Sequence, residues 1–152
     1  MRAVRIEASE VIVTAPAKES FVDLTDDLRR AVKDSSVTSG MAIAYCMHTT
    51  CGLLINEAED GAFEDVVLRL RSLVPAAGYY AHDDLDRRTQ NLQDGPEPPN
   101  GRAHVVQMIL GGSSLSIPVL AGDPSLGTWQ RLLLLELDDP KPRRVVFQTL
   151  GV

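Results

Sequence analysis

The second half of the chain constrains the fold most, because turn residues divide it into short apolar runs. There are four such runs, over residues 103–110, 114–120, 132–137 and 145–150. The first three are separated by the pair Gly111-Gly112 and by the triplet Gly122-Asp123-Pro124. Short apolar runs bounded by Gly and Pro are typical of buried strands. We therefore expect the second half to be mostly β-sheet, with a strand over 103–110.

The first half combines strands with two helices. Strands are expected through residues 11–13 and over 19–24, 41–48 and 53–55. A helix is predicted after Thr25, which can cap it, because Leu28, Ala31 and Val32 form an apolar stripe at helical spacing. This helix is expected to end by Ser36. A second helix follows the acidic group after residue 56 and is stopped by Pro75.

Residues 79–101 have a different character, with seven charged residues, three prolines and two glycines. A loop of this length inside a compact domain is usually functional or disordered. His82 opens this loop and His104 follows it. We therefore expect the loop to belong to a functional site.

Composition excludes several classes of function. The 152 residues suit one domain, residues 1–152, and a net charge of −6 argues against nucleic acid and anionic membranes as partners. No run approaches the about 20 apolar residues that span a bilayer, and the start lacks a signal-type apolar block, so a cytoplasmic protein is expected. The spacing of Cys46 and Cys51 fits neither a disulfide scaffold nor a Cys-rich zinc site, and both are expected to be reduced thiols.

The three histidines, His48, His82 and His104, are each expected at the end of a strand. Neutral imidazole is a common metal ligand, and a three-histidine set with one open position suits zinc that polarises a water or a carbonyl. The alternative is that each histidine satisfies a local hydrogen bond or lies at the surface.

Other side chains offer weaker signals. Glu57, Asp83 and Asp84 are candidates for ligands, for partners that orient an imidazole, or for an acid or base, against the alternative of solvated loop charge. Cys51 is a candidate nucleophile if a histidine activates it, although a free cysteine is more often a small buried residue.

Six motifs follow one another in order along the chain, and together they carry a family resemblance. They are His48-Thr49-Thr50-Cys51-Gly52-Leu53 with Ile55-Asn56-Glu57, Tyr80-Ala81-His82-Asp83-Asp84, Asn100-Gly101-Arg102-Ala103-His104, Gly112-Ser113-Ser114 with Ile117-Pro118-Val119, Leu126-Gly127-Thr128-Trp129-Gln130, and Glu136-Leu137-Asp138. This ordered set resembles the YjbQ-like family, known as secondary thiamine-phosphate synthases. The chain departs from the family pattern at two places. It has Asp139-Pro140-Lys141 where the family tends to have Gly-Pro-Arg, and Arg102 where related members often carry another histidine, which argues against a four-histidine metal site.

The resemblance implies an α+β fold with a mixed or antiparallel, sandwich-like sheet core and two main helices, usually assembled as a homotrimer. It implies catalytic roles for His48, Glu57, His82 and His104, with the three histidines also as metal ligands. It implies substrate contacts from Thr49, Asn56, Asn100, Ser114, Thr128 and Gln130. The implied activity is a weak thiamine-phosphate synthase reaction, which joins a pyrimidine diphosphate to a thiazole phosphate.

Ligand chemistry qualifies that expectation. Departing pyrophosphate requires positive charge, for which Mg²⁺ is a simple source, but imidazole ligands favour zinc or another transition metal. We therefore expect an enzyme acting on a small phosphorylated molecule, with hydrolase-type metal chemistry as an open possibility. The alternative is a non-catalytic metabolite- or metal-binding trimer that uses the same pocket.

Overall fold

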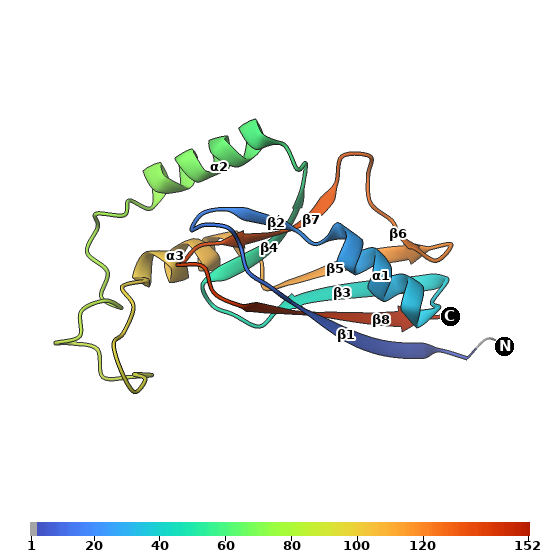
Figure 1. The fold of residues 1–152 in the computed structure, drawn as a ribbon, viewed down its shortest axis with the longest axis horizontal. Helices are drawn as coiled ribbons and strands as arrows, with labels where there is room; N and C mark the ends of the chain where they lie inside the picture. Colours follow the sequence, from blue (N-terminus) through green and yellow to red (C-terminus); the bar gives the residue numbers. More distant parts are fainter. Residues whose placement is uncertain (1–2) are drawn as a thin grey trace.

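The computed structural model describes residues 3–152, which form two antiparallel sheets flanked by helices (Figure 1). The larger sheet, sheet A, has the strand order β1-β8-β3-β5-β6, and the smaller one, sheet B, has the order β2-β7-β4. The strands are β1 Arg5–Val13, β2 Phe21–Asp23, β3 Ser39–Cys46, β4 Cys51–Asn56, β5 Ser114–Leu120, β6 Asp123–Pro124, β7 Arg131–Glu136 and β8 Arg143–Gly151. All pairings are antiparallel, which confirms the expected α+β class.

Three helices accompany the sheets instead of the two main helices expected from the sequence: α1 Thr25–Ser35, α2 Asp60–Leu73 and α3 Gly101–Leu110. The first two match the expected helices. Thr25 begins α1 without capping it, since its hydroxyl oxygen accepts the backbone N–H of Leu132. Glu59 caps α2, because its carboxylate accepts the N–H groups of Gly61 and Ala62, both at 2.8 Å.

The strand expected over 103–110 is wrong, because this segment is helix α3. Its β-branched residues favour a strand, yet Ala103 and Val106 are buried at a spacing of three while Met108 and Ile109 are exposed. The helix ends at Gly111, which adopts the left-handed conformation with φ of 65° and donates its N–H to the carbonyl of Gln107. Tertiary packing therefore overrides local propensity here.

Strand β7 is buried on both faces and divides the core into two clusters. Leu132 and Leu134 point toward α1 and sheet A, whereas Leu135 and the following Leu137 pack against α2 and α3. Since successive side chains of a strand point to opposite faces, an uninterrupted run of leucines serves both layers at once. On β3 buried and exposed side chains alternate, with Ala42, Ala44 and Cys46 buried and Met41 and Tyr45 exposed.

Helix α2 lies at the periphery and extends away from the sheets (Figure 1). Leu70 is its buried residue, and near its start Phe63 stacks on Phe21 of β2 with ring centroids 4.1 Å apart. The remaining apolar residues of this helix are partly or fully exposed. Helix α2 is thus held at few points.

The outer face of sheet A exposes large apolar side chains: Ile6, Ile12, Met41, Tyr45, Met47 and Leu120. Trp129, in the β6–β7 connection, is also 71% exposed. Within residues 3–152 we find no helix with the length and apolarity needed to cross a membrane.

Candidate functional site

A cleft of about 560 Å³ lies between the long polar loop, the start of α3 and the segment after β7. Four residues expected in the site line it: Thr49, His82, Asn100 and His104. The other lining residues are Arg88, Asn91, Gln93, Glu97, Pro98 and Lys141. The loop bracketed by two histidines therefore does fold back onto them.

The rings of His82 and His104 are neighbours, with centroids 4.3 Å apart and planes tilted by 49°. Asp83 explains this approach, because its carboxylate accepts the backbone N–H of Gly101 at 2.8 Å and so satisfies the first turn of α3. Burial lowers the pKa of His104 below its ordinary value, and the adjacent His82 lowers it further. His104 is thus a neutral imidazole near pH 7.

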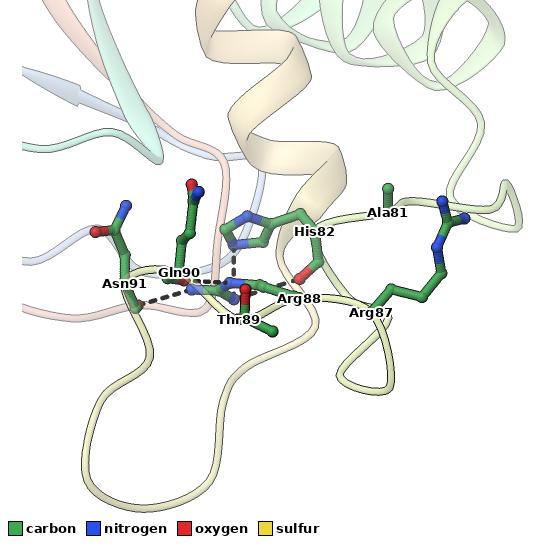
Figure 2. Close-up of a pocket in the computed structure, with 7 residues that line it drawn as sticks. All are labelled: Ala81, His82, Arg87, Arg88, Thr89, Gln90 and Asn91. Carbon is green, nitrogen blue, oxygen red and sulfur yellow. Dashed lines mark hydrogen bonds between the residues drawn. The ribbon is translucent and has the colours of Figure 1, made fainter.

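Arg88 organises the loop around His82 (Figure 2). Its guanidinium donates to the carbonyls of Gln90 and Asn91 and pairs with Glu97 at 3.1 Å. It also lies 3.2 Å from Nε2 of His82. Because a guanidinium only donates, Nε2 of His82 is the acceptor, which leaves Nδ1 as the donor of this ring. The same two side chains border a further recess of about 540 Å³ that is lined by residues of the loop itself.

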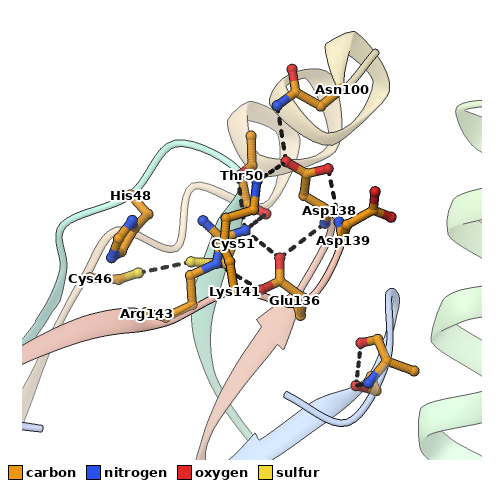
Figure 3. Close-up of polar contacts among 12 residues, drawn as sticks. Cys46, His48, Thr50, Cys51, Asn100, Glu136, Asp138, Asp139, Lys141 and Arg143 are labelled. Carbon is orange, nitrogen blue, oxygen red and sulfur yellow. Dashed lines mark hydrogen bonds and ion pairs between the residues drawn. The ribbon is translucent and has the colours of Figure 1, made fainter. Parts of the chain in front are cut away.

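Asp138 connects the cleft to the sheet behind it (Figure 3). The carboxylate accepts hydrogen bonds from Nδ2 of Asn100 at 2.9 Å and Nζ of Lys141 at 2.7 Å. Burial would raise the pKa of Asp138, but these bonds and the N–H of Asp139 outweigh burial and lower the pKa to about 2. Asp138 therefore fixes one amide and one cation at the edge of the cleft.

A second layer of charge is fully buried beneath this edge. Arg143 donates to both carboxylate oxygens of Glu136, and its Nη2 lies 3.0 Å from the hydroxyl oxygen of Thr50. Both charged side chains are almost inaccessible, at 2% and 0%. The ion pair anchors Thr50, the residue that follows Thr49 of the cleft.

His48 does not reach the cleft. It lines a separate recess of about 320 Å³ with Ile12, Met47, Pro142 and Arg144. Its Nε2 accepts the backbone N–H of Arg144 at 2.8 Å, and burial followed by the charge of Arg143 lowers the pKa of His48. The convergence expected for three histidines is therefore met by two of them within one chain.

The described residues contain no group of three or more His, Cys, Asp or Glu placed to hold a metal ion. Nε2 of His82 faces Arg88, and Nε2 of His48 faces a backbone N–H. The donor set of one chain thus does not fit a three-histidine metal site.

Four other expected site residues gather at the opposite end of sheet B: Asn56, Glu57, Thr128 and Gln130. Strand β4 separates the two ends, since Cys51 pairs with Glu136 near the cleft and Asn56 pairs with Arg131 at the far end. A strand of this length spans about 17 Å. All four side chains are exposed, as is Ser114 at the start of β5, and none of the five lines the cleft.

Sequence reasoning missed Arg88 and Lys141 as lining of the cleft, and Asp138 as the carboxylate that holds Lys141 there. Arg88 was one charge among many in the loop, and its role depends on carbonyls that only the folded loop presents. A usable signal existed for the buried pair, because Glu136 ends an apolar run and Arg143 begins the next strand. Charges embedded in apolar strands are usually paired.

Comparison with known proteins gives a consistent result. Residues 9–152 match the family model described as UPF0047 protein YjbQ-like. A UPF0047 protein of Archaeoglobus fulgidus is 36% identical, covering 93% of this chain and 99% of that one. The UPF0047 protein YugU of Bacillus subtilis is 30% identical, covering 88% and 92%. Among solved structures, a protein of unknown function from Sulfolobus solfataricus has a TM-score of 0.84 at 26% identity, covering 99% and 100%, and a hypothetical protein from Aeropyrum pernix has 0.80 at 31%, covering 96% and 99%.

Proposed function

Because the chain belongs to the YjbQ-like UPF0047 family, we propose that it is an enzyme that binds a small phosphorylated substrate in the cleft between His82 and His104. The adjacency of these two rings, 4.3 Å apart beside a cleft that Arg88 and Lys141 also line, carries the proposal. Arg88 and Lys141 bring two cations to the cleft of an acidic chain, each paired with one carboxylate, Glu97 and Asp138, and an anion would bind as a further partner of these cations. The two imidazole rings add N–H donors for phosphate oxygens.

The reaction we propose is the thiamine-phosphate synthase type of transfer. The thiazole nitrogen attacks the methylene carbon of the pyrimidine diphosphate, a carbon–nitrogen bond forms, and the carbon–oxygen bond breaks as pyrophosphate leaves with the electron pair. A protein can accelerate this transfer by stabilising the negative charge that develops on the departing pyrophosphate. Lys141 and the N–H of His82 supply that stabilisation in this proposal.

The divalent metal expected from the sequence stays a prediction. The donors of one chain do not fit a three-histidine site, and no step proposed here passes through a metal ion.

The family resemblance also implies a homotrimer, and we include that assembly in the proposal. Two observations support it: the exposed apolar face of sheet A, and the location of Asn56 and Gln130 at the end of sheet B that lies opposite the cleft. A neighbouring subunit is the simplest means of bringing the two ends together. Mixing inactive His104→Ala and Gln130→Ala chains would then restore part of the activity, whereas a site within one chain would give none.

The direct test combines binding and turnover. Purified protein is incubated with the pyrimidine diphosphate and the thiazole phosphate, and thiamine phosphate is quantified by mass spectrometry. Lys141→Met is expected to weaken binding of inorganic pyrophosphate by about 1.5 to 3 kcal/mol, or roughly ten- to hundredfold in Kd. Lys33→Met, on the exposed surface of α1, is the matched control and is expected to change nothing.

The outcomes separate the possible functions. Product formation that depends on Lys141 and His104 supports the proposal. Pyrophosphate binding without turnover favours the non-catalytic metabolite-binding alternative, and absence of both overturns the assignment of this cleft.

A further inference from the structure

Cys46 and Cys51 form a buried pair behind the cleft. Cys46 is the last residue of β3 and Cys51 the first of β4, so the pair lies where the chain passes from sheet A to sheet B. Their Sγ atoms are 3.1 Å apart, and the side chains are 1% and 0% exposed. These are the two cysteines of the whole sequence.

The two sulfurs are chemically unequal. The hydrogen bond from the thiol of Cys51 lowers the pKa of Cys46, and the same bond raises the pKa of Cys51. Burial and the carboxylate of Glu136 act in the opposite direction on the pKa of Cys46, whereas the guanidinium of Arg143 also lowers it. The 3.1 Å contact between the two sulfurs means that a reaction at one of them takes place beside the other.

We infer that Cys46 and Cys51 are a redox modification site that forms a reversible intramolecular disulfide when the chain meets an oxidant of the peroxide class. The thiolate of Cys46 attacks one peroxide oxygen, the oxygen–oxygen bond breaks, and Cys46 becomes a sulfenic acid as hydroxide leaves. The sulfur of Cys51 then attacks the sulfur of Cys46, its proton leaves with the hydroxyl as water, and the sulfur–sulfur bond forms. Two thiols and one hydrogen peroxide therefore give one disulfide and two waters.

Geometry favours this product over further oxidation. The sulfurs need to approach by only about 1 Å to reach disulfide length. The second thiol is already in contact with the first sulfur, so a sulfenic acid at Cys46 meets a resolving thiol before another peroxide molecule. Burial restricts access to small oxidants that penetrate with local fluctuation.

The disulfide would close residues 46–51 into a covalent ring, with residues 47–50 between the two cysteines. This segment contains Thr49, which lines the cleft, and Thr50, which accepts a hydrogen bond from Arg143. Oxidation therefore acts on a segment that borders the cleft. Formation of the disulfide does not depend on the function proposed for the cleft.

The test uses the full chain, first reduced and desalted, then exposed to a series of hydrogen peroxide concentrations. Samples are unfolded in the presence of a thiol-alkylating reagent, and the intact mass is measured. We expect both thiols to disappear together, giving an unlabelled monomer lighter by about two mass units, and dithiothreitol to restore both labels. Because exposed methionines also gain oxygen, the oxidised chain is digested and the peptides of Cys46 and Cys51 are measured separately. Thiols that survive peroxide in the folded chain, added oxygen on either cysteine, or covalent dimers would overturn the inference.

Single-cysteine variants supply the control. Cys46→Ser and Cys51→Ser each lack one partner, so the unlabelled lighter product must vanish in both. Its persistence in either variant would show that the mass change comes from another reaction and would reject the assignment. Circular dichroism of both variants verifies that they are folded.

Discussion

The carboxylate of Asp83 accepts the backbone N–H of Gly101 at 2.8 Å, and this bond determines where the long loop meets helix α3. Asn100, the residue before the helix, uses its own side chain to bind Asp138 instead of capping the helix. A Cβ atom at Gly101 would lie 2.7 Å from Cβ of Tyr80, so the close approach requires glycine. His82 and His104 are neighbours because the residues beside them are connected in this way.

Removal of the cap is expected to loosen the loop. Asp83→Ala leaves the Gly101 N–H without its partner and should lower the free energy of unfolding by about 1 kcal/mol. Limited proteolysis should cut residues 84–99 faster in this variant. Asp86→Ala, at an exposed position of the same loop, is the control, and equal cleavage of the two variants would contradict the capping role.

The buried ion pair is expected to be costly to break on one side. Arg143→Met leaves Glu136 as an unpaired buried charge and should lower the free energy of unfolding by about 3 to 5 kcal/mol in urea titrations. The double variant Glu136→Gln with Arg143→Met should recover part of that loss. Arg144→Met, next in sequence but half exposed, should stay within about 0.5 kcal/mol of the parent chain.

Stability at low pH should report on Asp138. Its folded-state pKa of about 2 lies below the ordinary unfolded value, so its contribution is complete at neutral pH and is lost as pH falls from about 4 toward 2. The contribution amounts to about 2 kcal/mol. Asp138→Asn should flatten the pH dependence of unfolding in this range. An unchanged profile would mean that Lys141 and Asn100 do not hold the carboxylate in solution.

Anion binding in the cleft should strengthen as His104 gains a proton. Because the pKa of His104 is lowered, the free protein carries little charge there at pH 7, and a bound anion favours the protonated form. Sulfate, whose charge is constant over this range, should therefore bind more tightly as pH falls from about 8 to about 5.5. His104→Gln should weaken the dependence, while His48→Gln, in the separate recess, should preserve it. A dependence that follows His48 instead would place the anion outside the cleft.

Periodicity predicted the elements whose local pattern agrees with their packing. The apolar run over 41–48 predicted strand β3, and Pro75 correctly marked the end of α2. Helix α3 was not predicted from the sequence, because Val105, Val106 and Ile109 favour a strand. Its start is stabilised by Asp83, which lies 18 residues earlier in the chain. A cap supplied by tertiary structure leaves no local signal.

Part of the candidate site was predictable, namely the part formed by one continuous segment of the chain, residues 82–104. The loop that begins at His82 returns to His104 and the two rings lie side by side, a meeting that the family motifs predicted and the spacing of 22 residues alone did not. His48 and Gln130 do not join them, because the path of β3 and the length of β4 place them elsewhere. Lys141 was recognised as a site residue only in the structure, where its bond to Asp138, just after β7, holds it at the cleft.

The sparse attachment of helix α2 has a consequence for how the molecule opens. With Leu70, the stacked pair of Phe21 and Phe63, and the ion pair of Arg71 with Glu19 as its main anchors, this helix forms a cooperative unit of low local stability. Its amide protons should exchange with deuterated solvent much earlier than those of β7, whose two covered faces resist everything short of global unfolding. The first excursions of the native state therefore detach α2 while the two sheets stay intact.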